Sequence, residues 1–261
     1  MFHEFIFCIF ACDTIKRYKD EIHKIEETWG KEAEGFGSGS GSGSASGSGF
    51  GKFLFFLGEH GPLVGDNYIH LENVGDDYLS AADKQYLGIK YVYEHYDFRY
   101  LYVCGTDTFV LVKNLTEFMR SQQFNEDDAI IMGGHGDNRT ICDTHVHFFS
   151  GGAGLILTKK TVELLHPRLE SMQSEWLDLC VANNYITYIP ACDVSICYFL
   201  KLLNARFVNV QNRFFNCNYV GYNNTPSGLY KCCTQTVDIK TMIACHNMSP
   251  SDFDNLNKLI A

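Results

Sequence analysis

Residues 102–110 read Tyr102-Val103-Cys104-Gly105-Thr106-Asp107-Thr108-Phe109-Val110. The apolar run at 100–104 predicts a buried strand, which stops at a glycine and brings one carboxylate, that of Asp107, to its end. The chain turns apolar again at Phe109, and an acid between two buried stretches is costly unless a cation or hydrogen-bond donors satisfy it. Because ligands gather at the carboxyl ends of strands in α/β sheets, Asp107 is a candidate metal ligand. The alternative is a turn aspartate that bonds its own backbone.

Apolar runs and helical periodicities alternate on both sides of this stretch. We expect strands at 5–11, 52–57, 68–71, 100–104, 129–133, 144–149 and 208–210, an extended segment at 186–190, and helices at 81–96, 115–122, from 161, 175–183, 195–203 and 250–259. Strands that alternate with helices are typical of a mostly parallel sheet with helices on both faces. The predicted fold class is therefore α/β.

A further helix is expected before the second strand, running to Trp29 with Asp13 or Thr14 as its cap. Its apolar positions recur at helical spacing, while lysine and glutamate fill the other face; the apolar positions are Ile15, Tyr18, Ile22, Ile25 and Trp29. The pattern predicts an amphipathic helix that packs on the sheet.

Residues 35–51 are almost entirely glycine and serine and predict a flexible surface loop. Only one strand and one helix precede this loop, so we expect one domain spanning 1–261. The region 212–245 is rich in Asn, Tyr and Cys, shows little periodicity, and is expected to be irregular.

Composition excludes several classes of protein. A hydrophobic content of 46% with 14% aromatic residues indicates a globular chain, and the net charge of −10 argues against binding to nucleic acid or anionic membranes. No segment reaches the roughly 18 apolar residues that a membrane span needs. Eleven cysteines are compatible with disulfides in an oxidising compartment, or with buried free thiols in a cytosolic protein. Sequons at Asn114, Asn138, Asn223 and Asn247 add weak support for a secretory route.

Six segments, in chain order, resemble the motifs of one enzyme family. They are Glu-Thr-Trp-Gly at 27–30, Asp77-Tyr78 followed by Lys84, Gly-Thr-Asp-Thr-Phe-Val at 105–110, Ser-Gly-Gly-Ala-Gly at 150–154, Cys-Asp-Val-Ser-Ile at 192–196, and a tail of Arg-Phe-Phe-Asn at 213–216, Cys232-Cys233 and Cys245-His246-Asn247. The chain resembles the inverting β1,3-glycosyltransferases of glycosyltransferase family 31. That family includes Fringe, the β1,3-galactosyltransferases and the core 1 galactosyltransferases, and the tail is most similar to the core 1 branch.

The resemblance implies a GT-A type fold with a Rossmann-like nucleotide-binding half and a role for several residues. It assigns Asp107 and His246 as ligands of Mn²⁺, a cation that accepts carboxylate, imidazole, phosphate and water ligands together. It places Asp193 at the position of the general base that deprotonates the acceptor hydroxyl. Without the resemblance, an ordinary helix cap is the favoured role of Asp193, and a packed core position that of His246.

The resemblance also implies residues that contact the UDP-sugar. Lys84 is expected to offset diphosphate charge or to fix a helix end, with a solvated surface lysine as the alternative. Glycines 151 and 152 are expected to let backbone N–H groups approach the sugar, or only to turn the chain. The remaining positions that fall on the donor-binding motifs are Asp77 and Thr106.

The chain departs from the family pattern at its acidic motif. Of three consecutive acids in the family, only the third is present, as Asp107, while Gly105 and Thr106 replace the first two. The expected direct metal ligand is therefore kept, and the acids that hold waters and ribose hydroxyls are lost. Cys192 replaces a further acid before Asp193.

Three other functions are left open by the sequence. His145 and His147 lie on one face of a predicted strand near His135 and Asp137, which suggests a metal-dependent hydrolase, although no H-E-x-x-H motif is present. His246 with Cys232, Cys233 and Cys245 suggests a zinc cluster, although adjacent cysteines rarely fit one tetrahedron. The replaced acids suggest a degenerate, non-catalytic glycan- or nucleotide-binding protein.

The resulting hypothesis is an inverting, Mn²⁺-dependent β1,3-glycosyltransferase that moves a hexose from a UDP-sugar to a glycan or glycoprotein. Galactose is the expected sugar, with glucose and N-acetylglucosamine as alternatives. A membrane anchor preceding this sequence would place the protein in the Golgi or secretory lumen; otherwise we expect it in the cytoplasm.

Overall fold

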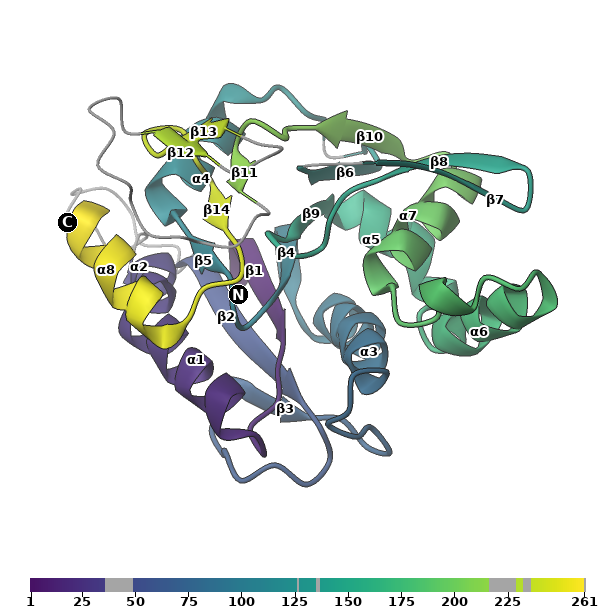
Figure 1. Ribbon diagram of the computed structural model, residues 1–261. Coiled ribbons are helices and arrows are strands. Elements are labelled where there is room, and N and C mark those ends of the chain that lie inside the picture. The colour runs from purple at the N-terminus through teal and green to yellow at the C-terminus, as the bar shows by residue number, and fades with distance from the viewer. Residues whose placement is uncertain (36–48, 126, 135–136, 216–228, 232–235, 261) are drawn as a thin grey trace.

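A seven-stranded sheet forms the centre of the protein (Figure 1). The computed structural model describes residues 1–35, 49–125, 127–134, 137–215, 229–231 and 236–260. The strand order is β10-β6-β9-β4-β1-β2-β3, with bounds Arg206–Asn209, Ile130–Gly133, Leu155–Thr158, Asp97–Gly105, Phe2–Phe10, Gly49–Leu57 and Tyr68–His70. Only β9 runs antiparallel to its neighbours, so the sheet is mostly parallel, as the sequence predicts.

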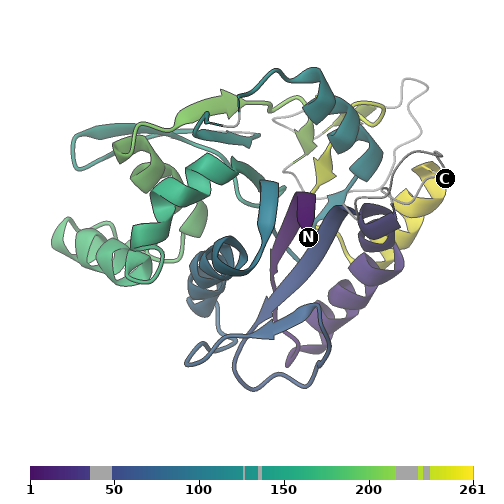
Figure 2. The same cartoon turned by 180° about the vertical axis from the view of Figure 1, so that it is seen from behind.

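Helices cover both faces of this sheet, as Figures 1 and 2 show. One face packs against α1 (Lys16–Glu27), α2 (Trp29–Gly35), α4 (Val112–Ser121) and α8 (Pro250–Ile260). The other packs against α3 (Ser80–His95), α5 (Lys159–Leu165), α6 (Met172–Ala182) and α7 (Cys192–Leu202). The central strand β1 is continuously apolar from Phe5 to Ile9 with each side chain 0% exposed, which is typical of a parallel strand buried on both faces. The predicted α/β class is confirmed.

Three short sheets complete the described chain. The pair β7 (Asp137–Ile141) and β8 (Thr144–Phe148) forms a hairpin, and β12 (Leu229–Lys231) pairs with β13 (Thr236–Asp238). The third sheet has the order β11-β14-β5, with bounds Phe214–Phe215, Ala244–Cys245 and Phe109–Val110. Short strands thus organise part of the tail that the sequence predicted to be irregular.

The carboxyl ends of the parallel strands define one edge of the large sheet. Phe10 pairs with Gly105, so β1 and β4 end side by side, and residues 106–108 follow directly. Strand β9 runs the opposite way, and its first residue, Leu155, pairs with Val103 and Gly133. The glycine turn at 150–154 therefore lies at the same edge as Asp107.

The first helix differs from its predicted pattern. It begins at Lys16 without a side-chain cap, because Asp13 instead accepts a hydrogen bond from the Leu63 N–H, and Thr14 donates to Asp76. Ile15 and Tyr18 are 47% and 37% exposed, whereas Glu21 is 0% exposed. At the start of the helix, the face that is buried therefore differs from the face predicted by the apolar residues.

Two other local predictions differ from the structure. Residues 155–158 form β9 in the middle of the sheet rather than a lead into a helix, and residues 186–188 form a 3₁₀ helix rather than an extended segment. Gly35 ends α2 and Gly49 begins β2, so the predicted glycine- and serine-rich loop is shorter at both ends, and 36–48 lie outside the described residues.

Cysteines and membrane spans can be assessed only where the chain is described. The eight cysteines at 8, 12, 104, 142, 180, 192, 197 and 245 are free thiols, whereas Cys217, Cys232 and Cys233 lie outside the described residues. None of the described helices has the length and apolar character required to cross a bilayer.

Candidate functional site

The small sheet β11-β14-β5 brings His246 to Asp107. Cys245 pairs antiparallel with Phe109 and parallel with Phe215, and the pairing continues as the Met248 N–H donates to the Asp107 carbonyl at 2.9 Å. The His246 N–H donates to the Phe215 carbonyl at 2.9 Å. Two residues far apart in the chain are therefore fixed side by side by backbone bonds.

Their side chains face each other at the carboxyl edge of the large sheet. His246 Nε2 lies 3.4 Å from Asp107 Oδ2, and the two side chains are 26% and 25% exposed. The partly open position leaves both side chains accessible to a ligand. The structure thus brings together the two residues that the resemblance assigned to a metal.

The glycine turn packs against this pair. Thr108 Oγ1 donates to the Gly152 carbonyl at 2.8 Å, and an added Cβ at Gly152 would lie 2.5 Å from His246 Cε1 and Nδ1. Gly154 has φ +95°, a conformation that side chains other than glycine rarely adopt. The turn therefore needs glycine both for its backbone path and for the close approach of the imidazole.

Gly152 offers a direct test of this packing. We expect Gly152→Ala to push the His246 ring away and to weaken Mn²⁺ binding at least about tenfold, while lowering stability by about 1–3 kcal/mol from overpacking. Mn²⁺ titration followed by electron paramagnetic resonance, with urea unfolding in parallel, measures both effects. Gly35→Ala is the matched control, because an added Cβ there meets nothing within 4 Å. Unchanged Mn²⁺ affinity in Gly152→Ala contradicts the predicted role of the ring.

Asp193 joins the same group of residues from the first turn of α7. Its Oδ2 accepts a hydrogen bond from the Gly151 N–H at 2.9 Å, and its Oδ1 accepts one from the Val194 N–H at 2.8 Å. Burial raises the pKa of the Asp193 carboxyl, against the lowering effect of these two N–H donors. The neighbouring His246 also acts to lower the pKa of Asp193, so this carboxylate lies close to the Asp107–His246 pair. Each oxygen keeps a lone pair for a further donor.

Thr106, immediately before Asp107, is turned toward α1. Its side chain is 5% exposed, and Oγ1 donates to Glu21 Oε2 at 2.6 Å. Thr106 therefore fixes the position of the loop that carries Asp107, and its predicted contact with the donor stays a prediction.

Lys84 and Asp77 belong to a second group of residues at the start of α3. Lys84 is 3% exposed, donates to the Ala11 carbonyl at 2.8 Å, and forms an ion pair with Asp76. The expectation of a solvated surface lysine is therefore wrong. Asp77 accepts hydrogen bonds from the Leu79 and Ser80 N–H groups and from the Ser80 hydroxyl, as a helix cap does. No described contact joins these residues to Asp107 or His246, and their predicted roles in nucleotide binding stay predictions.

The Lys84–Asp76 pair links α3 to the end of β1, and its loss is expected to destabilise the fold. Burial acts to raise the pKa of Asp76, but bonds from Lys84 and Thr14 outweigh it and hold the pKa below its usual range. We expect Lys84→Met to lower the free energy of unfolding by about 3 kcal/mol, because a partly buried carboxylate loses its partner. Urea unfolding at pH 7 measures this loss.

The pH dependence gives an independent check of this pair. Since the folded pKa of Asp76 is lowered, its stabilisation is present above the unfolded pKa of about 4 and is lost as the pH falls through the folded value. Stability of Lys84→Met should therefore fall less between pH 5 and pH 3 than that of the unmodified protein. An equal fall in both proteins contradicts this assignment.

The Asp107–His246 pair fits a divalent cation. Two ligands at about 2.1 Å in octahedral geometry lie about 3.0 Å apart, close to the observed 3.4 Å. A carboxylate oxygen with an imidazole nitrogen suits Mn²⁺. Among the described residues no group of three or more His, Cys, Asp or Glu side chains could hold a metal, so a cation bound by this pair would need ligands from other molecules, such as phosphate oxygens and water.

The rival metal sites gain no support from the described chain. His145 is exposed, and His147 Nδ1 lies 3.2 Å from Asn138 Oδ1 on the neighbouring strand β7. These two histidines belong to no three-ligand cluster of the described residues, and His135 lies outside those residues. The zinc cluster needs Cys232 and Cys233, which lie outside them as well.

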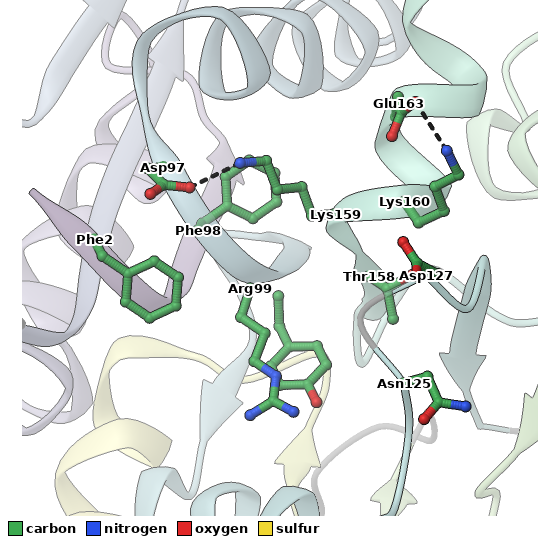
Figure 3. Close-up of a pocket in the computed structure, with 11 residues that line it drawn as sticks. Phe2, Asp97, Phe98, Arg99, Asn125, Asp127, Thr158, Lys159, Lys160 and Glu163 are labelled. Carbon is green, nitrogen blue, oxygen red and sulfur yellow. Dashed lines mark hydrogen bonds and ion pairs between the residues drawn. The ribbon is translucent and has the colours of Figure 1, made fainter.

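A cavity of about 380 Å³ opens at the opposite edge of the large sheet (Figure 3). It lies beside the first residues of β1 and β4 and the last residue of β9. Its cations are neutralised locally, since Lys159 pairs with Asp97 and Lys160 with Glu163. This cavity therefore offers no evident anion site and is separate from the Asp107–His246 site.

Sequence reasoning missed two residues that border the site, Arg17 and Glu21. The sequence pattern placed the glutamates of the first helix on its outer face, whereas Glu21 is buried against Thr106, and it gave Arg17 no role. Their spacing of four residues is a sequence signal for an ion pair on one helix face, but many exposed pairs share it.

The protein is similar to known proteins in its fold and not in its sequence. No family model and no curated protein matches the sequence. Among solved structures, the chain is similar to the crystal structure of a glycosyltransferase involved in the glycosylation of the major capsid of PBCV-1, with a TM-score of 0.50 and 12% sequence identity. The similarity covers 98% of each chain. The protein thus shares the fold of that glycosyltransferase.

Proposed function

We propose that this protein is a glycosyltransferase that uses a UDP-sugar and a divalent cation. The observation that carries the proposal is the Asp107–His246 pair at the carboxyl edge of a glycosyltransferase-like sheet. Two protein ligands leave room for phosphate oxygens, as a nucleotide-bound cation requires. When bound there, Mn²⁺ would neutralise charge on the departing diphosphate.

The finer assignment is an inverting β1,3-transferase that resembles glycosyltransferase family 31. Asp193 accepts the proton of the acceptor hydroxyl, a role favoured by the pKa that burial raises. Its N–H bonds from Gly151 and Val194 hold the carboxylate in a fixed orientation. Backbone groups of the glycine turn border the sugar position. Galactose is the proposed donor sugar, and a glycan or glycoprotein the acceptor.

A panel of UDP-sugars tests this function. The protein is incubated with Mn²⁺ and UDP-galactose, UDP-glucose or UDP-N-acetylglucosamine, with and without a panel of glycan acceptors, and UDP release is measured. The proposal predicts Mn²⁺-dependent release with one donor, which increases with a suitable acceptor. Binding of UDP without release from any donor favours the non-catalytic binding protein, and no binding of UDP rejects both functions.

A further inference from the structure

Glu21 is a buried carboxylate next to the candidate metal site. It lies on α1 with 0% of its surface exposed, and both of its oxygens are engaged. Oε2 accepts from Thr106 Oγ1 at 2.6 Å, and Oε1 accepts from Arg17 Nε at 2.9 Å. Glu21 therefore connects the Asp107 loop to a guanidinium on the first turns of α1.

This arrangement is electrostatically costly without a cation. Burial raises the pKa of Glu21, and the nearby Asp107 carboxylate raises it further. Thr106 and Arg17 act in the opposite direction. Glu21 is therefore buried near the Asp107 carboxylate and holds Arg17 by a hydrogen bond. This arrangement suggests that Glu21 serves to fix the position of Arg17.

The Arg17 guanidinium is held through Nε, while its two terminal nitrogens have no described hydrogen bond. Its side chain is 59% exposed, and the only described hydrogen bond of its guanidinium is the Nε bond to Glu21. The bond to Glu21 raises the pKa of Arg17, and the Asp107 charge adds to this effect. The two terminal nitrogens of the guanidinium are thus available to bind an anion near Asp107.

The other basic residue predicted to serve a diphosphate is committed elsewhere. Lys84 is buried and bonds the Ala11 carbonyl and Asp76. Its ammonium keeps one further N–H, but the side chain is only 3% exposed and has little access to an anion from solvent. Arg17 can bind an anion without losing its bond to Glu21.

We propose that Arg17 is a diphosphate-binding residue of this site and that Glu21 is the positioning residue that aims it. This inference rests on the proposed function, and it adds a cation contributed by the first turn of α1, where the resemblance assigned no site residue. Arg17 contacts the phosphate oxygens, while Glu21 fixes the guanidinium and, through Thr106, the Asp107 loop.

Calorimetric titration of UDP at saturating Mn²⁺, with Mn²⁺ alone followed by electron paramagnetic resonance, tests the proposal. Arg17→Gln should weaken UDP binding about 10- to 100-fold, as expected for a lost charge-assisted contact. The same variant should leave Mn²⁺ binding unchanged or make it tighter, because a positive charge near Asp107 is removed. Lys16→Gln is the matched control, since Lys16 forms the equivalent pair with Asp20 on the exposed side of α1. It should bind UDP as the unmodified protein does.

The Glu21→Gln variant distinguishes a role of Glu21 in positioning Arg17 from a role in packing alone. Glutamine keeps the size of the side chain and an acceptor for Thr106 but loses the charge that holds Arg17. It should weaken UDP binding in the unmodified background and have no further effect in Arg17→Gln. Additive effects of the two substitutions contradict a role of Glu21 through Arg17.

The remaining outcomes distinguish this inference from the proposed function. Unchanged UDP affinity in Arg17→Gln, or a parallel loss of UDP and Mn²⁺ binding, overturns the inference while the proposed function stands. Absence of UDP binding in the unmodified protein overturns the proposed function itself, and the inference with it.

Discussion

Replacement of Asp107 by Asn is expected to reduce Mn²⁺-dependent sugar transfer by about 100-fold or more. The substitution keeps the size of the side chain but removes the charged oxygen 3.4 Å from His246, and a cation contributes several kcal/mol to stabilising the leaving diphosphate. Initial rates of UDP release, measured across a series of Mn²⁺ concentrations, quantify the loss. Higher Mn²⁺ should recover only part of the rate.

The fold should survive this substitution. The backbone of Asp107 keeps its bond to the Met248 N–H, and asparagine keeps the size of the partly exposed side chain. The free energy of unfolding should change by less than about 1 kcal/mol. Asp20→Asn, which removes an exposed carboxylate from α1, serves as the control. Transfer at the unmodified rate in Asp107→Asn rules out this carboxylate as a metal ligand.

Asp193→Asn is expected to lower kcat by about 100- to 10,000-fold while UDP and Mn²⁺ still bind. Loss of a general base has this magnitude. Asp193 lies in the first turn of α7 and is not its N-cap, which is Ala191, and asparagine keeps an oxygen that can accept the bond from the Gly151 N–H. Because burial raises the pKa of Asp193, its ionised form costs stability at neutral pH, so the variant should be as stable or more stable. Turnover is compared with the thermal shift that UDP and Mn²⁺ produce.

The pH profile provides a second readout for Asp193. The ionised form is the active one, so kcat should fall as the pH falls through the pKa of Asp193, which lies above the ordinary value of about 3.9. Residual activity of Asp193→Asn should lack this acidic limb. A variant that keeps full turnover, or keeps the fall of kcat at low pH, contradicts the assignment of Asp193 as the general base.

Much of the fold follows from local sequence patterns. The apolar runs around Ile9 and Tyr102 are long enough to identify central strands, and the regular alternation with helices identifies the α/β class. Strand β9 was missed because three apolar residues and a threonine next to a helix have no distinctive period. The exposure of Ile15 and Tyr18 depends on where α1 leaves the sheet edge, which helical periodicity does not encode.

The site is predictable only in part, for a related reason. Asp107 follows a predicted strand and can be found from the local pattern, whereas His246 lies in a tail without periodicity and was identified only through the resemblance. The small sheet that unites them depends on pairing between distant segments. Glu21 was missed because burial of a charged helix residue depends on its partners, here Thr106 and Arg17, and those contacts are tertiary.

A crystal structure of the protein with UDP and Mn²⁺, with manganese located by its anomalous scattering, tests the central claim most directly. The account predicts one manganese peak within about 2.2 Å of an Asp107 carboxylate oxygen and His246 Nε2, and also bonded to the diphosphate. A manganese peak at any other position, or UDP bound away from this edge of the sheet, contradicts it.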